Sequence, residues 1–100
     1  MKNGYNIFWT DFALKELENT IEYIEQNWSE KELKNLAEKL EETLNLISKN
    51  PDIFQVSEFK KDVRRVVVLK YNTIYYRFNN NQIEILSFFS NRQHPDKRKL

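Results

Sequence analysis

Apolar side chains recur at helical spacing in two consecutive stretches of the first half of the chain. In the first stretch they lie three or four residues apart, as on one face of an α-helix: Leu14, Leu17, Ile21, Ile24 and Trp28. Thr10 or Asp11 can cap this helix, because a side-chain oxygen there satisfies a free backbone N–H. Ser29 and Glu32 form the capping box of a second helix, which ends before Asn50-Pro51. The pattern predicts an antiparallel helical hairpin with a very short connection.

The second half of the chain changes to strand patterns rich in β-branched and aromatic residues. Three runs are separated at hairpin lengths by Tyr71-Asn72 and by Asn79–Asn81: V-R-R-V-V-V-L-K (63–70), T-I-Y-Y-R-F (73–78) and Q-I-E-I-L-S-F-F (82–89). A further short run, 5–9, precedes the first helix. We therefore predict a single α+β domain, residues 1–100, of order β-α-α-β-β-β. Its helical hairpin packs on a four-stranded, mostly antiparallel, twisted sheet.

Composition excludes several classes of protein and site. No apolar run approaches the roughly 20 residues that a membrane-spanning helix needs. The chain has no cysteine, one histidine and one glycine. It therefore offers no disulfide framework, no His-pair metal motif and no glycine-rich phosphate loop, and we expect neither a metal nor a cofactor. These features fit a cytoplasmic protein.

The net charge of +1 conceals an uneven distribution. Residues 1–50 hold six lysines against ten acidic residues, whereas residues 51–100 hold ten basic residues against five acidic ones. All five arginines lie in the second half. Either one part of the fold offers an anion-binding face, or acidic helices and basic strands neutralise each other.

Strand alternation places basic and aromatic side chains on one face of the sheet. Tyr75 and Arg77 share a face of their strand. If the side chains that alternate with them pack on the helices, Tyr75 and Arg77 project from the open side of the sheet. Either Arg64 or Arg65 must join them, because neighbours in a strand point to opposite faces. The basic segment 92–100 follows the last strand. Such a face suits nucleic acid or an acidic partner, and the alternative is a solvated sheet face with a solvated terminus.

The order and spacing of several segments resemble toxins of the RelE/ParE superfamily from bacterial type II toxin–antitoxin modules. The resemblance covers nearly the whole chain. It rests on F-W-T-D-F-A-L-K-E-L (8–17), Y-I-E-Q-N-W-S (23–29), L-I-S-K-N-P (46–51), V-R-R-V-V-V (63–68), T-I-Y-Y-R-F (73–78) and I-E-I-L-S-F-F-S-N-R-Q-H-P (83–95).

The resemblance implies one of two targets. RelE-like members cut mRNA in the ribosome, and ParE-like members inhibit DNA gyrase without cutting RNA. An RNA-cleaving toxin would use Arg64, Arg65, Arg77, Arg92 and His94, but no tyrosine follows Tyr76, and Asn72-Thr73 stand where an arginine is expected. A net charge of +1 also suits ribosome binding poorly. We favour a ParE-like toxin that acts by binding; an endoribonuclease and a non-toxic binding module are the alternatives.

Two sets of residues are the candidate binding surfaces in this interpretation. The target-binding candidates are Arg65, Tyr75, Arg77, Arg92, Lys97 and Arg98. A cognate antitoxin is the expected second partner. Its candidates are aromatic residues in excess of what one small core encloses, expected to line a groove beside the helical hairpin: Trp9, Phe12, Trp28, Phe54 and Phe88.

Overall fold

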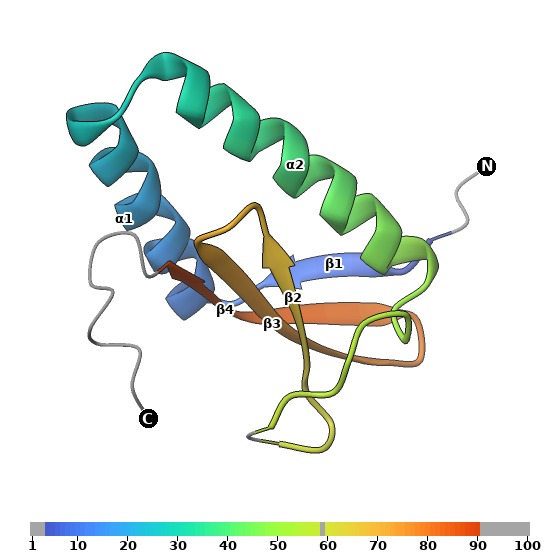
Figure 1. Cartoon of the computed structure of the whole chain (residues 1–100). Helices are drawn as coiled ribbons and strands as arrows, with labels where there is room; N and C mark the ends of the chain where they lie inside the picture. The colour runs from blue at the N-terminus through green and yellow to red at the C-terminus, as the bar shows by residue number, and fades with distance from the viewer. Residues whose placement is uncertain (1–3, 59, 91–100) are drawn as a thin grey trace.

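The computed structural model describes residues 4–58 and 60–90. Its elements, in chain order, are β1 (Asn6–Trp9), α1 (Asp11–Asn27), α2 (Glu30–Lys49), β2 (Arg64–Val68), β3 (Asn72–Asn79) and β4 (Gln82–Ser90). The predicted β-α-α-β-β-β order is confirmed. Figure 1 shows the two helices diverging from their short connection, with the sheet below them.

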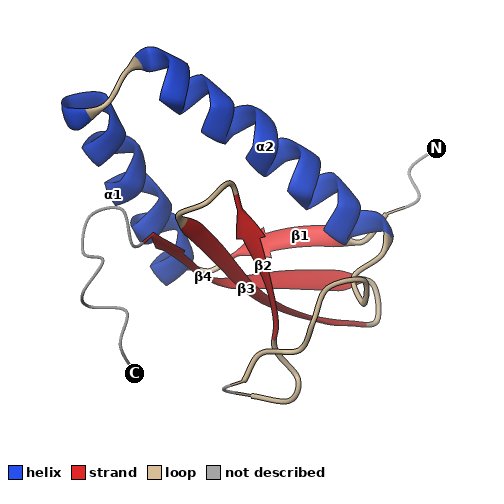
Figure 2. Ribbon diagram, in the orientation of Figure 1, coloured by secondary structure: helices blue, strands red, loops and turns tan. Residues whose placement is uncertain are grey.

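The four strands form one open, mixed sheet in the order β1-β4-β3-β2. β1 pairs with β4 in parallel, and the other two pairings are antiparallel. Both helices lie on the same side of this sheet (Figure 2). The core between the two layers is apolar and includes Ile24 and Ile47 from the helices with Ile74, Ile83 and Phe88 from the strands. The opposite face of the sheet is called the open face below.

The two hairpin turns use left-handed backbone conformations at non-glycine residues. Asn80 has φ 46°, a conformation that asparagine tolerates better than most residues, and it lies in the turn between β3 and β4. Leu69 has φ 59° and lies in the turn before β3. The sequence placed Asn72 in this turn, which is wrong: Asn72 begins β3 and is fully buried. Its Nδ2 donates a hydrogen bond of 3.1 Å to the carbonyl of Val68.

Side-chain oxygens cap both helices where the sequence predicted caps. Thr10 is the N-cap of α1, and its hydroxyl accepts a hydrogen bond from the Ala13 amide at 3.2 Å. Ser29 is the N-cap of α2, and its hydroxyl accepts from the Glu32 amide at 3.3 Å. Each contact satisfies a backbone N–H that the helix itself leaves unpaired. The connection between the helices is therefore fixed by the local sequence.

Helix α1 continues along the edge of β4 where β1 ends. The Thr10 hydroxyl donates to the Ile85 carbonyl at 2.9 Å. Further along α1, Glu16 Oε1 accepts hydrogen bonds from the Phe88 amide and from the Ser87 hydroxyl, both at 2.7 Å. On the side of β4 that β1 no longer covers, the Glu16 side chain thus takes the place of a neighbouring strand.

Tyr76 links the core to the loop after α2. Its side chain is fully buried, and its hydroxyl donates to the Pro51 carbonyl at 2.7 Å. Burial raises the pKa of Tyr76 to about 12, and the charge of Asp52 acts in the same direction, whereas Arg64 lowers it. The phenol is therefore kept neutral well above the pH at which it ionises in the unfolded chain.

We expect the free energy of unfolding to fall between pH 10 and 12 because of Tyr76. The unfolded phenol loses its proton near pH 10, whereas the folded one, with a pKa of about 12, keeps it. The stabilisation is therefore complete below pH 10 and is lost as the pH rises through the folded pKa. Urea unfolding at pH 9 and 11 measures this, and Tyr76→Phe should lose about 1 kcal/mol less than the unsubstituted protein over that interval.

The matched control for this prediction is Tyr23→Phe, which removes a hydroxyl from a half-buried side chain on α1. This variant should keep the pH dependence of the unsubstituted protein. An identical alkaline decline in Tyr76→Phe and Tyr23→Phe would contradict the assignment.

Candidate functional site

The open face of the sheet brings three of the predicted target-binding residues together. Arg65 of β2 lies directly across from Tyr75 of β3, and Arg77 follows two residues further along β3. Arg65 and Tyr75 are half-buried, and Arg77 is exposed. The alternation predicted from the sequence is confirmed for these residues, and Arg65 is the arginine of the 64–65 pair that lies on this face.

Arg64 points to the other face and has a structural role. Its Nη1 donates to the carbonyls of Phe54 at 2.7 Å and Asp52 at 3.3 Å. Its guanidinium also lies 5.6 Å from the centroid of the Phe78 ring, a cation–π distance. Arg64 thus ties the loop after α2 to the sheet. Because its donors are used in this way, it is a poor candidate for contacts on the open face.

Arg77 is surrounded by acidic groups. Its Nε donates to Glu84 Oε1 at 2.9 Å, and its Nη1 lies 3.9 Å from Asp62 Oδ2. With two carboxylates beside one guanidinium, this end of the open face is not positively charged. Such exposed pairs contribute about 0–1 kcal/mol to stability, so they mainly orient the guanidinium.

Arg65 is the cation of this face that remains available. Within residues 4–58 and 60–90, its guanidinium forms no ion pair. Lys60 and Lys61, both exposed, precede β2 in the chain. The positive charge of the described open face therefore centres on Arg65, with Tyr75 directly across from it on β3. Arg92, His94, Lys97 and Arg98 lie outside the described residues.

The aromatic residues predicted to bind an antitoxin occupy different environments. Phe88 is fully buried in the core, so its prediction as a docking residue is wrong. Trp9 is half-buried and packs on Phe88 with ring centroids 6.4 Å apart, and Phe54 is half-buried against the core. Phe12 and Trp28 are exposed, with 64% and 37% of their surfaces accessible.

Phe12 and Trp28 do not share a small groove. They stand at opposite ends of α1, about 24 Å apart at the rise of roughly 1.5 Å per helical residue. A partner that contacts both must therefore extend along α1. Phe8, which is 50% exposed on β1, was not among the predicted residues, although alternation with the inward Ile7 and Trp9 would have indicated it.

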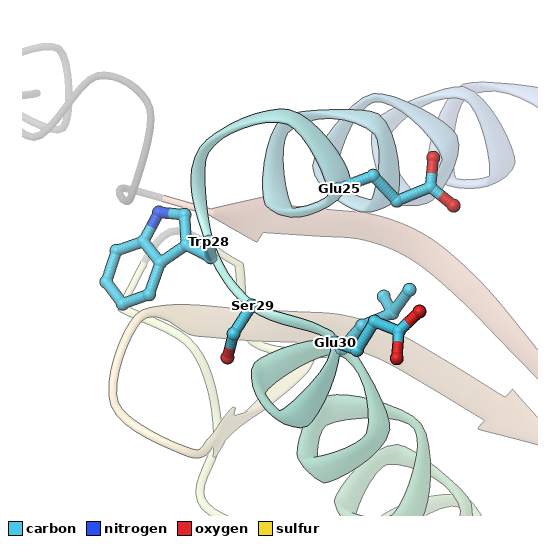
Figure 3. A pocket seen from close by; sticks show the side chains of 5 residues that line it. Glu25, Trp28, Ser29 and Glu30 are labelled. Atoms are coloured by element: carbon cyan, nitrogen blue, oxygen red, sulfur yellow. The ribbon is translucent and has the colours of Figure 1, made fainter.

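Trp28 lies at a small hollow where the helices join. The hollow is lined by Glu25, Trp28, Ser29, Glu30 and Leu33. Figure 3 shows the indole on one side of the connection and the carboxylates of Glu25 and Glu30 on the other. The Trp28 ring lies 6.1 Å from that of Tyr71, between centroids, so the turn before β3 reaches the tip of the helical pair.

Two kinds of site find no support in the described part of the chain. There, no group of three or more His, Asp or Glu side chains could hold a metal ion. No helix in that part is both long and apolar enough to cross a bilayer.

The fold is that of small toxins from toxin–antitoxin modules. The chromosomal ParDE TA system from P. aeruginosa is similar with a TM-score of 0.70 at 14% identity, over 89% of this chain and 98% of that one. The YoeB dimer from Staphylococcus aureus is similar with a TM-score of 0.59 at 19% identity, over 83% of this chain and 92% of that one. The YoeB–YefM complex from Staphylococcus aureus is similar with a TM-score of 0.56 at 19% identity, over 84% of this chain and 93% of that one.

Sequence comparison identifies the family within this fold. Residues 7–95 match the model of the ParE toxin of the type II toxin–antitoxin system, parDE. The chain therefore belongs to the ParE toxin family and is the toxin component of a type II module. No curated protein matches the sequence.

Proposed function

We propose that the protein arrests growth by binding DNA gyrase, and that the open face around Arg65 contacts this target. The observation that supports the proposal is the family match over residues 7–95, which favours the ParE-like alternative over the RelE-like one. The open face adds a second argument. Its described part presents one arginine without an ion pair, across from Tyr75, and not a dense group of cations, which suits a protein target better than a large RNA surface.

The arrangement of the arginines disfavours the RNA-cleaving alternative. Arg64 faces away from Arg65 and binds two backbone carbonyls, so the two cannot act together on one phosphate. Arg77 is held by Glu84 and Asp62. Cleavage through a ribose 2′-OH also needs a proton acceptor near the cations, which typically contributes about 10²–10⁴-fold in rate. On the described open face the carboxylate of Glu84 is committed to Arg77.

We propose a cognate antitoxin as the second partner. The similar structures include a ParDE TA system and a YoeB–YefM complex, which supports a partner of this kind. Phe12 and Trp28 are the exposed members of the predicted aromatic set, and Phe8 adds a third. A partner segment that follows α1 would cover Phe12 and Trp28 at its two ends.

Induction of the protein in growing cells separates the three candidate functions. A gyrase-binding toxin should stop growth, relax a reporter plasmid and induce the DNA-damage response, while mRNA ends stay unchanged. An endoribonuclease should produce new mRNA ends with normal supercoiling. Unaltered growth would indicate a non-toxic binding module. Either of the last two results would contradict the proposal.

Deleting residues 92–100 should remove toxicity and leave folding and antitoxin binding intact. The segment contains Arg92, Lys97, Arg98, Lys99, one aspartate and the single histidine, and we expect it to extend the target-binding surface. Replacing Lys97, Arg98 and Lys99 by glutamine keeps the length and tests the charge alone. Its effect on gyrase binding should be larger at low salt than at high salt, because salt screens exposed charges. Full toxicity of the soluble truncated protein would contradict this role.

A further inference from the structure

The outer edge of β2 is only half covered. The Arg65 amide donates to the Gln55 carbonyl at 3.0 Å, and the Ser57 amide donates to the Val63 carbonyl at 2.6 Å. These bonds, with the bridge between Val56 and Arg64, lay a short piece of the preceding loop along the start of β2. Figure 1 shows this loop turning back below the start of β2, away from its other end.

The direction of the Arg65 amide determines the direction of the Val67 amide. Backbone groups two residues apart in a strand point to the same side. Because the Arg65 N–H points away from β3, the N–H and C=O of Val67 also point outward. No partner for them is found among the described residues. The second half of β2 is therefore an open hydrogen-bonding edge in the described part of the sheet.

Exposed apolar side chains flank this edge. Val67 is 47% exposed, Leu69 38% and Val56 43%. Proteins commonly protect edge strands with charge, proline or a covering element, because an open apolar edge is a template for another strand. Here the apolar side chains are left at the edge.

The charges near the edge indicate what kind of strand fits it. Lys60, Lys61, Arg65 and Lys70 lie before, within and after β2. The one acidic residue between Lys60 and Lys70, Asp62, lies beside Arg77. A second copy of this edge, paired antiparallel about Val67, would meet the loop that already covers the outer side of Arg64 and Arg65. A short acidic strand that pairs with the second half of β2 alone avoids this loop and is attracted by the basic side chains around it.

We infer that the Val67 edge of β2 binds an extended, acidic segment of the cognate antitoxin as a fifth strand. This inference rests on the proposed antitoxin partner and adds the mode of binding. The segment would hydrogen-bond to the Val67 N–H and C=O and the Arg65 C=O, cover Val67 and Leu69, and set carboxylates near Arg65 and Lys70. Strand addition of this kind obtains affinity from the backbone and specificity from alternate side chains.

Residue-specific amide exchange tests the inference directly. The labelled toxin is measured alone and after co-expression with its antitoxin, which we expect the adjacent reading frame to encode. The Val67 amide should exchange quickly in the free toxin and at least about tenfold more slowly in the complex. The amides of Ile7 and Trp9, on the opposite edge of the sheet, provide an internal comparison because β1 also has an outer side. The inference predicts no protection there.

Two variants at Val67 provide the matched affinity measurement. Val67→Pro removes the outward N–H and should weaken the complex about tenfold. The substitution should not unfold the toxin, because an edge strand tolerates proline where the N–H points away from the sheet. Val67→Thr keeps the N–H and the β-branched shape, and should therefore lose much less affinity than Val67→Pro although it replaces a covered methyl group by a hydroxyl. If a complex forms and the Val67 amide exchanges as quickly in it as in the free toxin, the strand-addition inference is wrong. If the neighbouring product does not bind at all, the proposed antitoxin partner fails as well.

Discussion

Replacing Glu16 by alanine is expected to lower the free energy of unfolding by about 3 kcal/mol. The Glu16 carboxylate accepts from the Phe88 amide and the Ser87 hydroxyl, both at 2.7 Å, at the edge of β4 that β1 no longer covers. Alanine would leave the N–H of the buried Phe88 without a partner, and an unsatisfied buried group costs about 1–3 kcal/mol. The loss of two hydrogen bonds to a charged acceptor adds to this cost.

Urea unfolding of three variants isolates the role of the Glu16 carboxylate. Glu16→Gln keeps an acceptor oxygen, so its free energy of unfolding should fall by less than half as much as that of Glu16→Ala. Glu18→Ala removes an exposed carboxylate from the same helix and should change stability by less than about 0.5 kcal/mol. If Glu16→Ala were as stable as Glu18→Ala, the stabilisation of the β4 edge by α1 would be contradicted.

Reversing the charge of Arg65 is expected to abolish growth inhibition. Arg65 is the unpaired guanidinium of the described open face, and it lies across from Tyr75. Glutamate would repel the acidic surface that we expect on the target, and a change of this kind should weaken binding about a hundredfold or more. The fold should persist, because no ion pair of Arg65 is broken among the described residues. Growth after induction and binding to purified gyrase measure the two effects.

Lys34→Glu provides the same change in net charge at a different place. Lys34 is exposed on α2, away from the open face, so this variant should remain toxic. Thermal unfolding of both variants checks that neither has lost its fold. Equal toxicity of Arg65→Glu and Lys34→Glu would show that the open face does not contact the target.

Local patterns in the sequence were sufficient to predict the elements and the helix caps. The spacing of the apolar residues reports directly which face of each helix is buried, as Ile24 and Ile47 show. Ser29 and Glu32 predicted the start of α2 because capping depends on neighbours three residues apart. The pairing of Arg77 with Glu84 could also have been derived, since a turn at Asn80-Asn81 sets these two residues opposite each other.

A bulge in β4 determines which face of the sheet Phe88 occupies. Ile83 and Ile85 point to the core, so strict alternation would send Phe88 to the open face. The register changes between Tyr75 and Tyr76, which pair with Ser87 and Ile85, so Leu86 is an extra residue in β4. Such a bulge reverses the alternation after it and returns Phe88 to the core. The sequence around Leu86 carries no local signal for the bulge, which directly follows Ile85, the last residue of β4 that pairs with β1.

The choice between Arg64 and Arg65 also required tertiary structure. Alternation shows only that the two point to opposite faces. Arg64 is drawn to the helix side because the carbonyls of Asp52 and Phe54 and the ring of Phe78 gather there. These groups come from a loop and from another strand, so no local pattern in the sequence brings them together.

The supercoiling activity of purified DNA gyrase, measured against rising concentrations of this protein, tests the central claim most directly. We expect supercoiling to fall as the protein is added, Arg65→Glu to have little effect on it, and the co-purified product of the adjacent reading frame to restore it. Full supercoiling at saturating concentrations of a folded protein that still arrests growth, together with cleaved mRNA in the arrested cells, would contradict this claim.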